Sequence, residues 1–202
     1  MLYNKIKSFW RNKSSNKELK KLWFDRLVEW RKTGAVVRIN RPTRLDRARA
    51  LGYKAKQGIV LARVRLLRGG RKRRGSMKKG RRSKHARARK VVDLSFQTIA
   101  EQRANKNFKN CEVLNSYFVG KDGRYAFYEV ILVDRDHPQI ANNEQYRGLA
   151  NKTGRVFRGL TSSGKKSRGL RHKGKGAEKL RPSKTAFFRK RDSKQRKWVN
   201  FL

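Results

Sequence analysis

Apolar residues recur at helical spacing in the N-terminal part of the chain. The first set is spaced by one, three and four residues along one helical face: Tyr3, Ile6, Phe9 and Trp10. Ser15 to Glu18 then has the Ser-x-x-Glu pattern of a capping box, and a second apolar stripe runs from Leu19 to Trp30. The pattern predicts two amphipathic helices, and Gly34 suits the end of the second.

Alternation of apolar and polar residues replaces helical spacing after Gly58. Between Gly58 and Leu67 the apolar residues fall on one face, and Arg63 and Arg65 fall on the other, which predicts a half-buried strand with a basic outer face. Helical spacing returns from Val91 to Lys106.

Two further runs are rich in β-branched and aromatic residues, at 112–119 and 125–133. Asp122-Gly123 lies between them and favours a hairpin turn. A strand, a helix and a hairpin in this order predict an α+β fold, a small two-layer sandwich in which helices cover one face of a mainly antiparallel sheet.

Regular patterning fades after Asp134. His137-Pro138 and a series of glycines predict loops and extended chain, with a short helix near 186–197. The sequence therefore predicts a globular body over residues 1–140, which includes a long basic loop at about 68–90. An extended basic segment follows over 141–202.

Charge separates the same regions. The 202 residues include 57 Lys and Arg and 14 Asp and Glu, a formal net charge of +43. Residues 47–92 hold nineteen basic residues and no acidic one, whereas residues 91–150 hold seven basic and eight acidic residues. Blocks of like charge repel until a partner neutralises them, and nucleic acid supplies phosphates at the required density. We expect the near-neutral block to form the core.

Several other classes of protein fit poorly. Cys111 is the only cysteine, so an intramolecular disulfide is excluded, and a buried thiol in a reducing cytosol is expected. No run of apolar residues reaches the length of a signal sequence or a membrane span, which predicts a soluble chain without membrane contact. His85, His137 and His172 have no partner at metal-ligand spacing, so neither a metal nor another cofactor is expected.

Two patterns resemble enzyme motifs. Gly159 to Lys166 has the G-x-x-x-x-G-K spacing of a P-loop, but Lys166 stands where Ser or Thr would hold magnesium, and no apolar strand precedes the motif. The favoured interpretation is that its glycines admit the backbone close to phosphate. Asp134 and Asp136 follow a strand and leave open a metal-dependent nuclease, although further acidic partners are scarce.

The segment 41–58 combines arginines suited to phosphate, an aromatic Tyr53 for stacking, and small residues that permit close approach. A solvated charged face is the alternative. Base stacking also remains open for the N-terminal aromatic residues, which more often belong to a core. A protein that merely packages nucleic acid is a further alternative, but it would need no globular body.

Three segments carry a resemblance to a known family: RPTRLDRARALGYKAKQGIVLARVRLLRGGRKR at 41–73, EVLNSYFVGKDGRYAFYEVILVDRDHP at 112–138 and RGLTSSGKKSRGL at 158–170. They resemble the large-subunit ribosomal protein family fifteen-e of archaea and eukaryotes, in order over most of residues 1–185. The resemblance implies an α+β body with extended arms in large-subunit rRNA and no enzymatic activity.

The resemblance also implies partners and a location. We expect large-subunit rRNA and neighbouring large-subunit proteins as partners, no small-molecule substrate, no homo-oligomer and a place in the cytoplasmic large ribosomal subunit. The expected function is to stabilise rRNA tertiary packing. Together with the charge pattern, the resemblance predicts these rRNA-binding residues: Arg41, Arg44, Arg47, Arg49, Tyr53, Lys54, Lys56, Arg63, Arg65, Arg68, Arg71, Lys72, Arg73, Arg74, Lys165, Lys166, Arg168, Arg171, His172 and Lys173.

Overall fold

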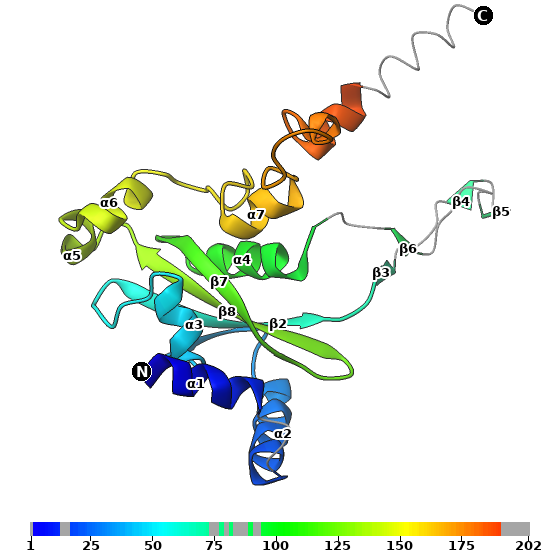
Figure 1. Ribbon diagram of the computed structural model, residues 1–202. Helices are drawn as coiled ribbons and strands as arrows, with labels where there is room; N and C mark the ends of the chain where they lie inside the picture. The colour runs from blue at the N-terminus through cyan, green and yellow to red at the C-terminus, as the bar shows by residue number, and fades with distance from the viewer. Residues whose placement is uncertain are drawn as a thin grey trace, which may run out of the picture.

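A four-stranded antiparallel sheet forms the centre of the molecule, with strand order β1-β2-β8-β7 (Figure 1). The computed structural model describes residues 2–12, 17–72, 77–78, 81–82, 89–90 and 94–190. The strands of the sheet are β1 (Val36–Ile39), β2 (Ile59–Leu67), β7 (Cys111–Lys121) and β8 (Tyr125–Asp134). The sequence pattern predicted the last three, and it missed β1 because four residues are too few to show an alternation.

Helices pack on both faces of this sheet. Ala100 and Ala104 of α4 (Phe96–Asn107) lie in one apolar cluster with strand residues such as Val64 and Val130. Leu27 of α2 (Lys17–Lys32) and Ala48 of α3 (Leu45–Ala50) lie in the cluster on the other face. The predicted α+β class is confirmed. The predicted coverage of one face becomes coverage of two, because the N-terminal helices pack opposite α4.

The helix predicted at 91–106 starts at Phe96. Ser95 caps it, since its hydroxyl accepts a hydrogen bond from the Thr98 backbone N–H at 3.2 Å. Residues 91–93 lie outside the described part of the chain.

Short antiparallel pairs occupy described parts of the predicted basic loop. β3 (Arg71–Lys72) pairs with β6 (Arg89–Lys90), and β4 (Met77–Lys78) pairs with β5 (Arg81–Arg82). The root of the loop is therefore a two-stranded ribbon, and the rest of the prediction falls on residues that are not described.

A ladder of aromatic rings joins the N-terminal helices to the core. Trp10 of α1 (Leu2–Arg11) meets Trp23 edge to face at 5.3 Å between ring centroids, and Trp23 meets Trp30 at 5.6 Å. Trp30 in turn lies 5.3 Å from Phe127 of β8. Edge-to-face pairs of this kind contribute about 0.5–1.5 kcal/mol each beyond area burial. The predicted core role of these aromatic residues is confirmed for Trp30, which is buried.

Gly120 makes room for this ladder in β7. A Cβ atom added there would lie 2.6 Å from a ring carbon of Trp23, whereas one added at Gly123 in the hairpin turn would meet nothing within 4 Å. We expect Gly120→Ala to lower the free energy of unfolding by about 1–3 kcal/mol, because the indole must shift. Urea denaturation of both variants measures this, with Gly123→Ala as the matched control. Equal midpoints for the two variants would contradict the expectation.

The prediction of loops after Asp134 was wrong in part. The structure has three short helices there, α5 (Pro138–Ala141), α6 (Glu144–Ala150) and α7 (Ser162–Ser167), followed by a 3-10 turn, η1 (Glu178–Leu180). Residues 184–190 are also helical, while the rest of the short helix predicted at 186–197 lies outside the described residues. Asn143 caps α6, since its side chain accepts from the Gln145 N–H at 3.0 Å.

Packing continues past the predicted boundary at residue 140. Tyr146 of α6 is buried with Val133, and Val156 is buried in the cluster beneath α4. The part of the C-terminal segment that carries α7 therefore rests on the body (Figure 1). No described helix has the length and apolar character needed to cross a membrane.

Candidate nucleic-acid interface

Thirteen of the twenty predicted rRNA-binding residues form two groups on opposite sides of the sheet. Residues 41–56 surround α3, which lies on the face that α2 covers, whereas residues 165–173 include α7 and lie beyond α4 (Figure 1). The exposed members of the two groups are Arg41, Arg47, Arg49, Lys54, Lys56, Lys165, Lys166, Arg171, His172 and Lys173, and Arg68, just after β2, is exposed as well. The structure thus presents two basic surfaces rather than one.

Four further predicted residues that belong to neither group are Arg71, Lys72, Arg73 and Arg74. The backbone of Arg71 and Lys72 forms β3, while Arg73 and Arg74 lie outside the described residues.

Other predicted residues are engaged inside the chain. The Arg63 guanidinium lies 4.5 Å from the Trp30 ring centroid, and burial lowers its pKa although Glu129 opposes the shift. The Arg44 guanidinium lies 5.0 Å from the Trp10 ring centroid and 3.1 Å from an Asp46 carboxylate oxygen. Both cations hold the N-terminal helices and the 41–56 segment to the body.

Three further predicted residues are half-buried. Tyr53 packs against the apolar cluster beneath α2. The Arg65 guanidinium lies 4.8 Å from the Tyr125 ring centroid. Arg168 ends α7 and donates to the Gly159 carbonyl oxygen at 3.4 Å. Through these contacts each side chain has a structural role within the chain. The sequence pattern alone does not distinguish such a role from RNA binding.

A buried carboxylate positions the start of the first basic surface. Glu129 of β8 accepts hydrogen bonds from the Tyr117 and Thr43 hydroxyls and from the Thr43 N–H, the last at 3.1 Å. Burial raises the pKa of Glu129, and these donors oppose that shift. Thr43 immediately precedes Arg44, so Glu129 fixes the backbone from which α3 and its arginines project.

The small side chain of Ala48 brings α3 against the sheet. Ala48 is buried, and its neighbours Arg47 and Arg49 are exposed on either side. The Arg49 guanidinium also lies 5.6 Å from the Tyr3 ring centroid of α1. One buried alanine between two exposed arginines therefore presents the first basic surface to solvent.

A second buried carboxylate anchors the other surface. Glu101 of α4 accepts hydrogen bonds from the Thr161 hydroxyl at 2.7 Å, from the Ser163 hydroxyl at 2.6 Å and from the Ser116 hydroxyl. Arg155 adds hydrogen bonds to the carbonyl oxygens of Val113 and Leu160 at 2.7 and 3.3 Å. The start of α7 is thereby tied to α4 and β7.

The hydroxyls of the P-loop-like sequence are used in this anchor. Thr161 caps α7 and accepts from the Gly164 N–H at 3.2 Å, while its own hydroxyl donates to Glu101. A Cβ atom at Gly164 would lie 2.8 Å from the Gly159 Cα atom. Packing against Gly159 therefore requires a glycine at position 164. The interpretation from the sequence had explained this glycine by close approach to phosphate alone.

Lys165 and Lys166 remain exposed on α7, while Thr161 and Ser163 point into the body. No described strand leads into this segment, and Lys166 occupies the position of the metal-binding hydroxyl of a P-loop. The neighbouring hydroxyls of Thr161 and Ser163 bind Glu101. The arrangement suits two cations held at fixed positions on the surface.

The second enzyme-like pattern also has a structural explanation. The Asp134 carboxylate accepts from the Asp136 N–H at 3.2 Å and closes the turn after β8. Within the described residues, no group of three or more His, Cys, Asp or Glu side chains is arranged to hold a metal ion.

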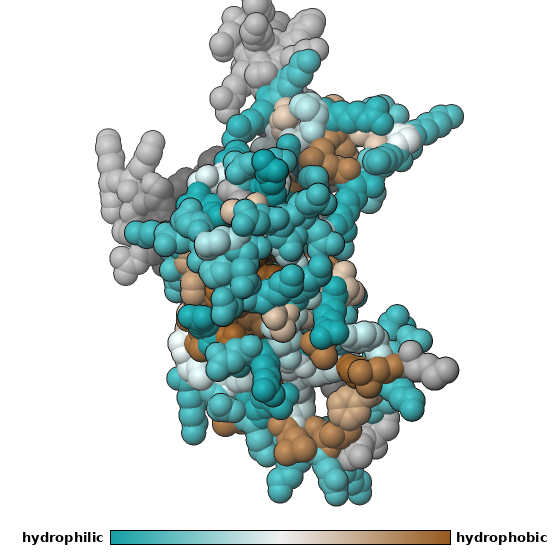
Figure 2. All heavy atoms as spheres, turned by 90° about the vertical axis from the view of Figure 1, so that its left-hand side faces the viewer, coloured by the Kyte–Doolittle hydropathy of each residue, from teal (hydrophilic) through white to brown (hydrophobic). Residues whose placement is uncertain are grey.

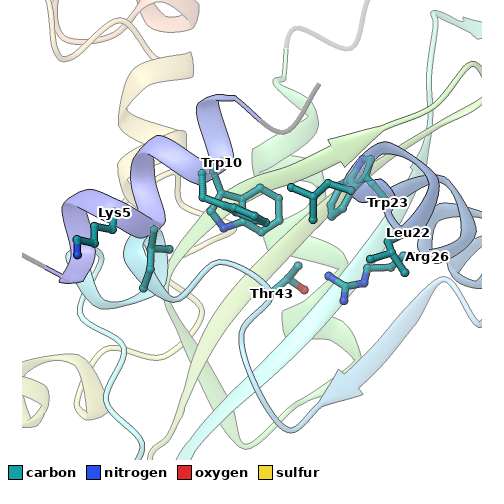
Figure 3. A pocket seen from close by; sticks show the side chains of 9 residues that line it. Lys5, Trp10, Leu22, Trp23, Arg26 and Thr43 are labelled. Carbon is teal, nitrogen blue, oxygen red and sulfur yellow. The ribbon is translucent and has the colours of Figure 1, made fainter. Parts of the chain in front are cut away.

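An apolar groove of about 600 Å³ lies between α1 and α2, with Thr43 beside it (Figure 3). Trp10 and Trp23 form part of its wall, and Lys5 and Arg26 are its charged lining residues. Brown apolar patches appear at the lower end of the molecule, where α1 and α2 lie (Figure 2). Leu22 is 64% exposed there. Because few donors line it, this groove is distinct from the phosphate-binding candidates.

Comparisons with known proteins agree with the resemblance seen in the sequence. The profile of the family described as Ribosomal L15 matches residues 1–187. The chain is 52% identical over 191 residues to the large ribosomal subunit protein eL15 of Methanocella arvoryzae, a match that covers 93% of this chain and 96% of the relative. It is 48% identical over 186 residues to the protein of the same name from Methanocorpusculum labreanum, covering 92% and 95%.

Proposed function

This chain belongs to the ribosomal L15 family and is a structural constituent of the large ribosomal subunit in the cytoplasm, and on this basis we propose how it acts there. It binds large-subunit rRNA through two basic surfaces and stabilises the tertiary packing of that rRNA. The α3 surface is defined by Arg41, Arg47, Arg49, Lys54 and Lys56, and the α7 surface by Lys165, Lys166, Arg171, His172 and Lys173.

The placement of these surfaces carries the proposal. They lie on opposite sides of the sheet, each is fixed by a buried carboxylate, and each exposes several cations. A rigid body with cations on two sides neutralises two separate RNA segments and holds them at a set distance. Contacts of this kind recognise phosphate position and the shape of A-form RNA rather than base identity.

Two other functions are less consistent with the geometry. A nuclease would need a metal-binding group of acidic residues, and Asp134 is engaged in a turn. A packaging protein would need no fixed positions for its cations, whereas Glu101 and Glu129 anchor both surfaces. Family membership also favours a structural constituent over an enzyme.

The α7 surface provides the direct test. We expect Lys165→Ala and Lys166→Ala to weaken binding to large-subunit rRNA by similar amounts, about three- to tenfold each, because each removes one exposed phosphate contact. Filter binding at fixed salt measures the affinity, and sucrose-gradient sedimentation measures incorporation into the large subunit.

The control is Lys20→Ala, which removes an exposed cation of α2 that belongs to neither surface, and we expect less than a twofold effect. A nucleotide-binding loop would behave differently, because Lys165→Ala alone would abolish ATP or GTP binding and Lys166→Ser would improve it. Micromolar nucleotide binding by the unmodified chain with that pattern would overturn the proposed role of this loop.

A further inference from the structure

A cleft of about 580 Å³ lies between the end of β2 and one face of α4. Its floor is apolar, with Leu66 buried and Phe96 and Ile99 half-buried. At its margin, Leu67 is 64% exposed and Leu94 is 40% exposed. Large apolar side chains left uncovered around an apolar floor favour a ligand that has an apolar part of its own.

Cationic and amide groups surround this floor. Gln102, Arg103 and Lys106 share one face of α4 with Ile99 because they are three or four residues apart, and Arg68 faces them from the end of β2. Among the residues that the structure describes, no carboxylate lines the cleft. Arg103 and Lys106 are exposed, and neither forms a salt bridge with another described residue. The ligand is therefore expected to carry negative charge as well.

The wall formed by the end of β2 is open to an approaching molecule. Arg68 donates hydrogen bonds to the carbonyl oxygens of Asp122 and Gly123, the second at 3.3 Å, so its guanidinium is held beside the hairpin turn. A Cβ atom at Gly69 would meet nothing within 4 Å. At the end of β2, a ligand would therefore contact the fixed Arg68 guanidinium and the uncrowded backbone at Gly69.

The cleft lies at the root of the basic ribbon. β3 follows the lining residue Gly70 directly, and its partner strand β6 ends at Lys90, four positions before the lining residue Leu94. Residues 47–92 contain no acidic residue. A polyanion drawn to that ribbon passes the cleft. An acidic protein segment would also meet cations here, but the acid-free ribbon beside the cleft favours RNA.

We propose that this cleft holds one unpaired nucleotide of large-subunit rRNA, an inference that rests on the proposed function. The base lies on the apolar floor beside Phe96, the neighbouring phosphates lie at Arg68, Arg103 and Lys106, and the Gln102 amide meets the base edge. The volume is within the range of about 300–1,000 Å³ that small-ligand sites occupy.

Photocrosslinking in the assembled large subunit identifies the occupant. Benzoylphenylalanine replaces Leu67, whose exposure makes the fold tolerant of the change, and the irradiated particles are analysed by mass spectrometry. We expect a crosslink to a single rRNA nucleotide. A crosslink to a neighbouring protein, or none at all, would overturn the proposal. The same replacement at Leu22 is the control for a surface away from the cleft, and it should not label that nucleotide.

Paired variants test the same site by affinity. Arg103→Gln with Lys106→Gln is expected to weaken rRNA binding about tenfold and to expose one unpaired base to chemical modification. Lys109→Gln with Lys121→Gln removes the same charge from exposed positions outside the cleft and should change affinity less than threefold. Equal losses for the two pairs would overturn the proposal.

The floor has its own test. Leu67→Ser with Leu94→Ser keeps the charge, so we expect the salt dependence of binding to stay the same while the base becomes reactive. An unchanged base reactivity would overturn the proposed role of the floor. If the unmodified chain binds no rRNA, the proposed function fails as well. If it binds rRNA but no nucleotide is labelled from position 67, only the cleft proposal fails.

Discussion

Raising the salt concentration from 50 to 200 mM is expected to weaken binding of this chain to large-subunit rRNA by about 10⁴–10⁵-fold. Neutralising about ten phosphates releases their condensed counterions, which gives a slope of log affinity against log salt of roughly −7 to −9. The chain has ample charge for this, at +43. Filter binding across a salt series measures the slope. A slope near −2 would mean that most of the basic residues do not touch RNA.

The structure supplies a matched comparison for this measurement. Arg47→Gln with Lys56→Gln removes two exposed cations of the α3 surface and should make the slope less steep by about 1.4–1.8. Arg63→Gln removes a cation that lies over the Trp30 ring, so we expect lower stability but the same slope. If all three changes altered the slope equally per charge, the division into exposed and inward-facing cations would be wrong.

Glu101→Leu is expected to lower the free energy of unfolding by about 3–5 kcal/mol, since it leaves buried hydroxyl donors without their acceptor. Thr161 and Ser163 would lose the bonds that tie α7 to α4. Urea denaturation measures the stability. Limited trypsin digestion should also cleave after Lys165 and Lys166 earlier than in the unmodified chain, because both lysines are exposed on the released segment.

Two further variants separate hydrogen bonding from charge. Glu101→Gln retains one acceptor oxygen and should cost less than the leucine variant. Glu29→Gln removes the same charge from an exposed position on α2, and we expect a change within about 0.5 kcal/mol. A loss for Glu29→Gln as large as that for Glu101→Gln would show that net charge, rather than the buried anchor, sets the stability.

Periodicity was enough to predict the longer elements of the fold. The strand containing Val64, the hairpin around Asp122 and the helix through Ala100 all follow from their patterns. The short elements did not, because β1 has four residues and α7 has six, less than two turns of helix. Their formation depends on pairing and capping partners that are distant in sequence.

The candidate surfaces were predictable as charge but not as geometry. Arg47 and Arg63 look alike in sequence, and only packing shows that one is exposed while the other lies over an indole ring. Glu101 and Glu129 gave no signal either, since a buried carboxylate is recognised by the hydroxyls that converge on it. Composition reports how much charge a chain has, whereas long-range contacts decide where that charge points.

The ladder of Trp10, Trp23 and Trp30 gives the chain an intrinsic spectroscopic signal that depends on its tertiary packing. The three indoles lie within 6 Å of their neighbours in edge-to-face contact, close enough for their electronic transitions to couple. The chain has four tryptophans in all, so most of its indole absorption comes from this one array. Near-ultraviolet circular dichroism therefore reports whether α1 and α2 are packed on the sheet, without any added label.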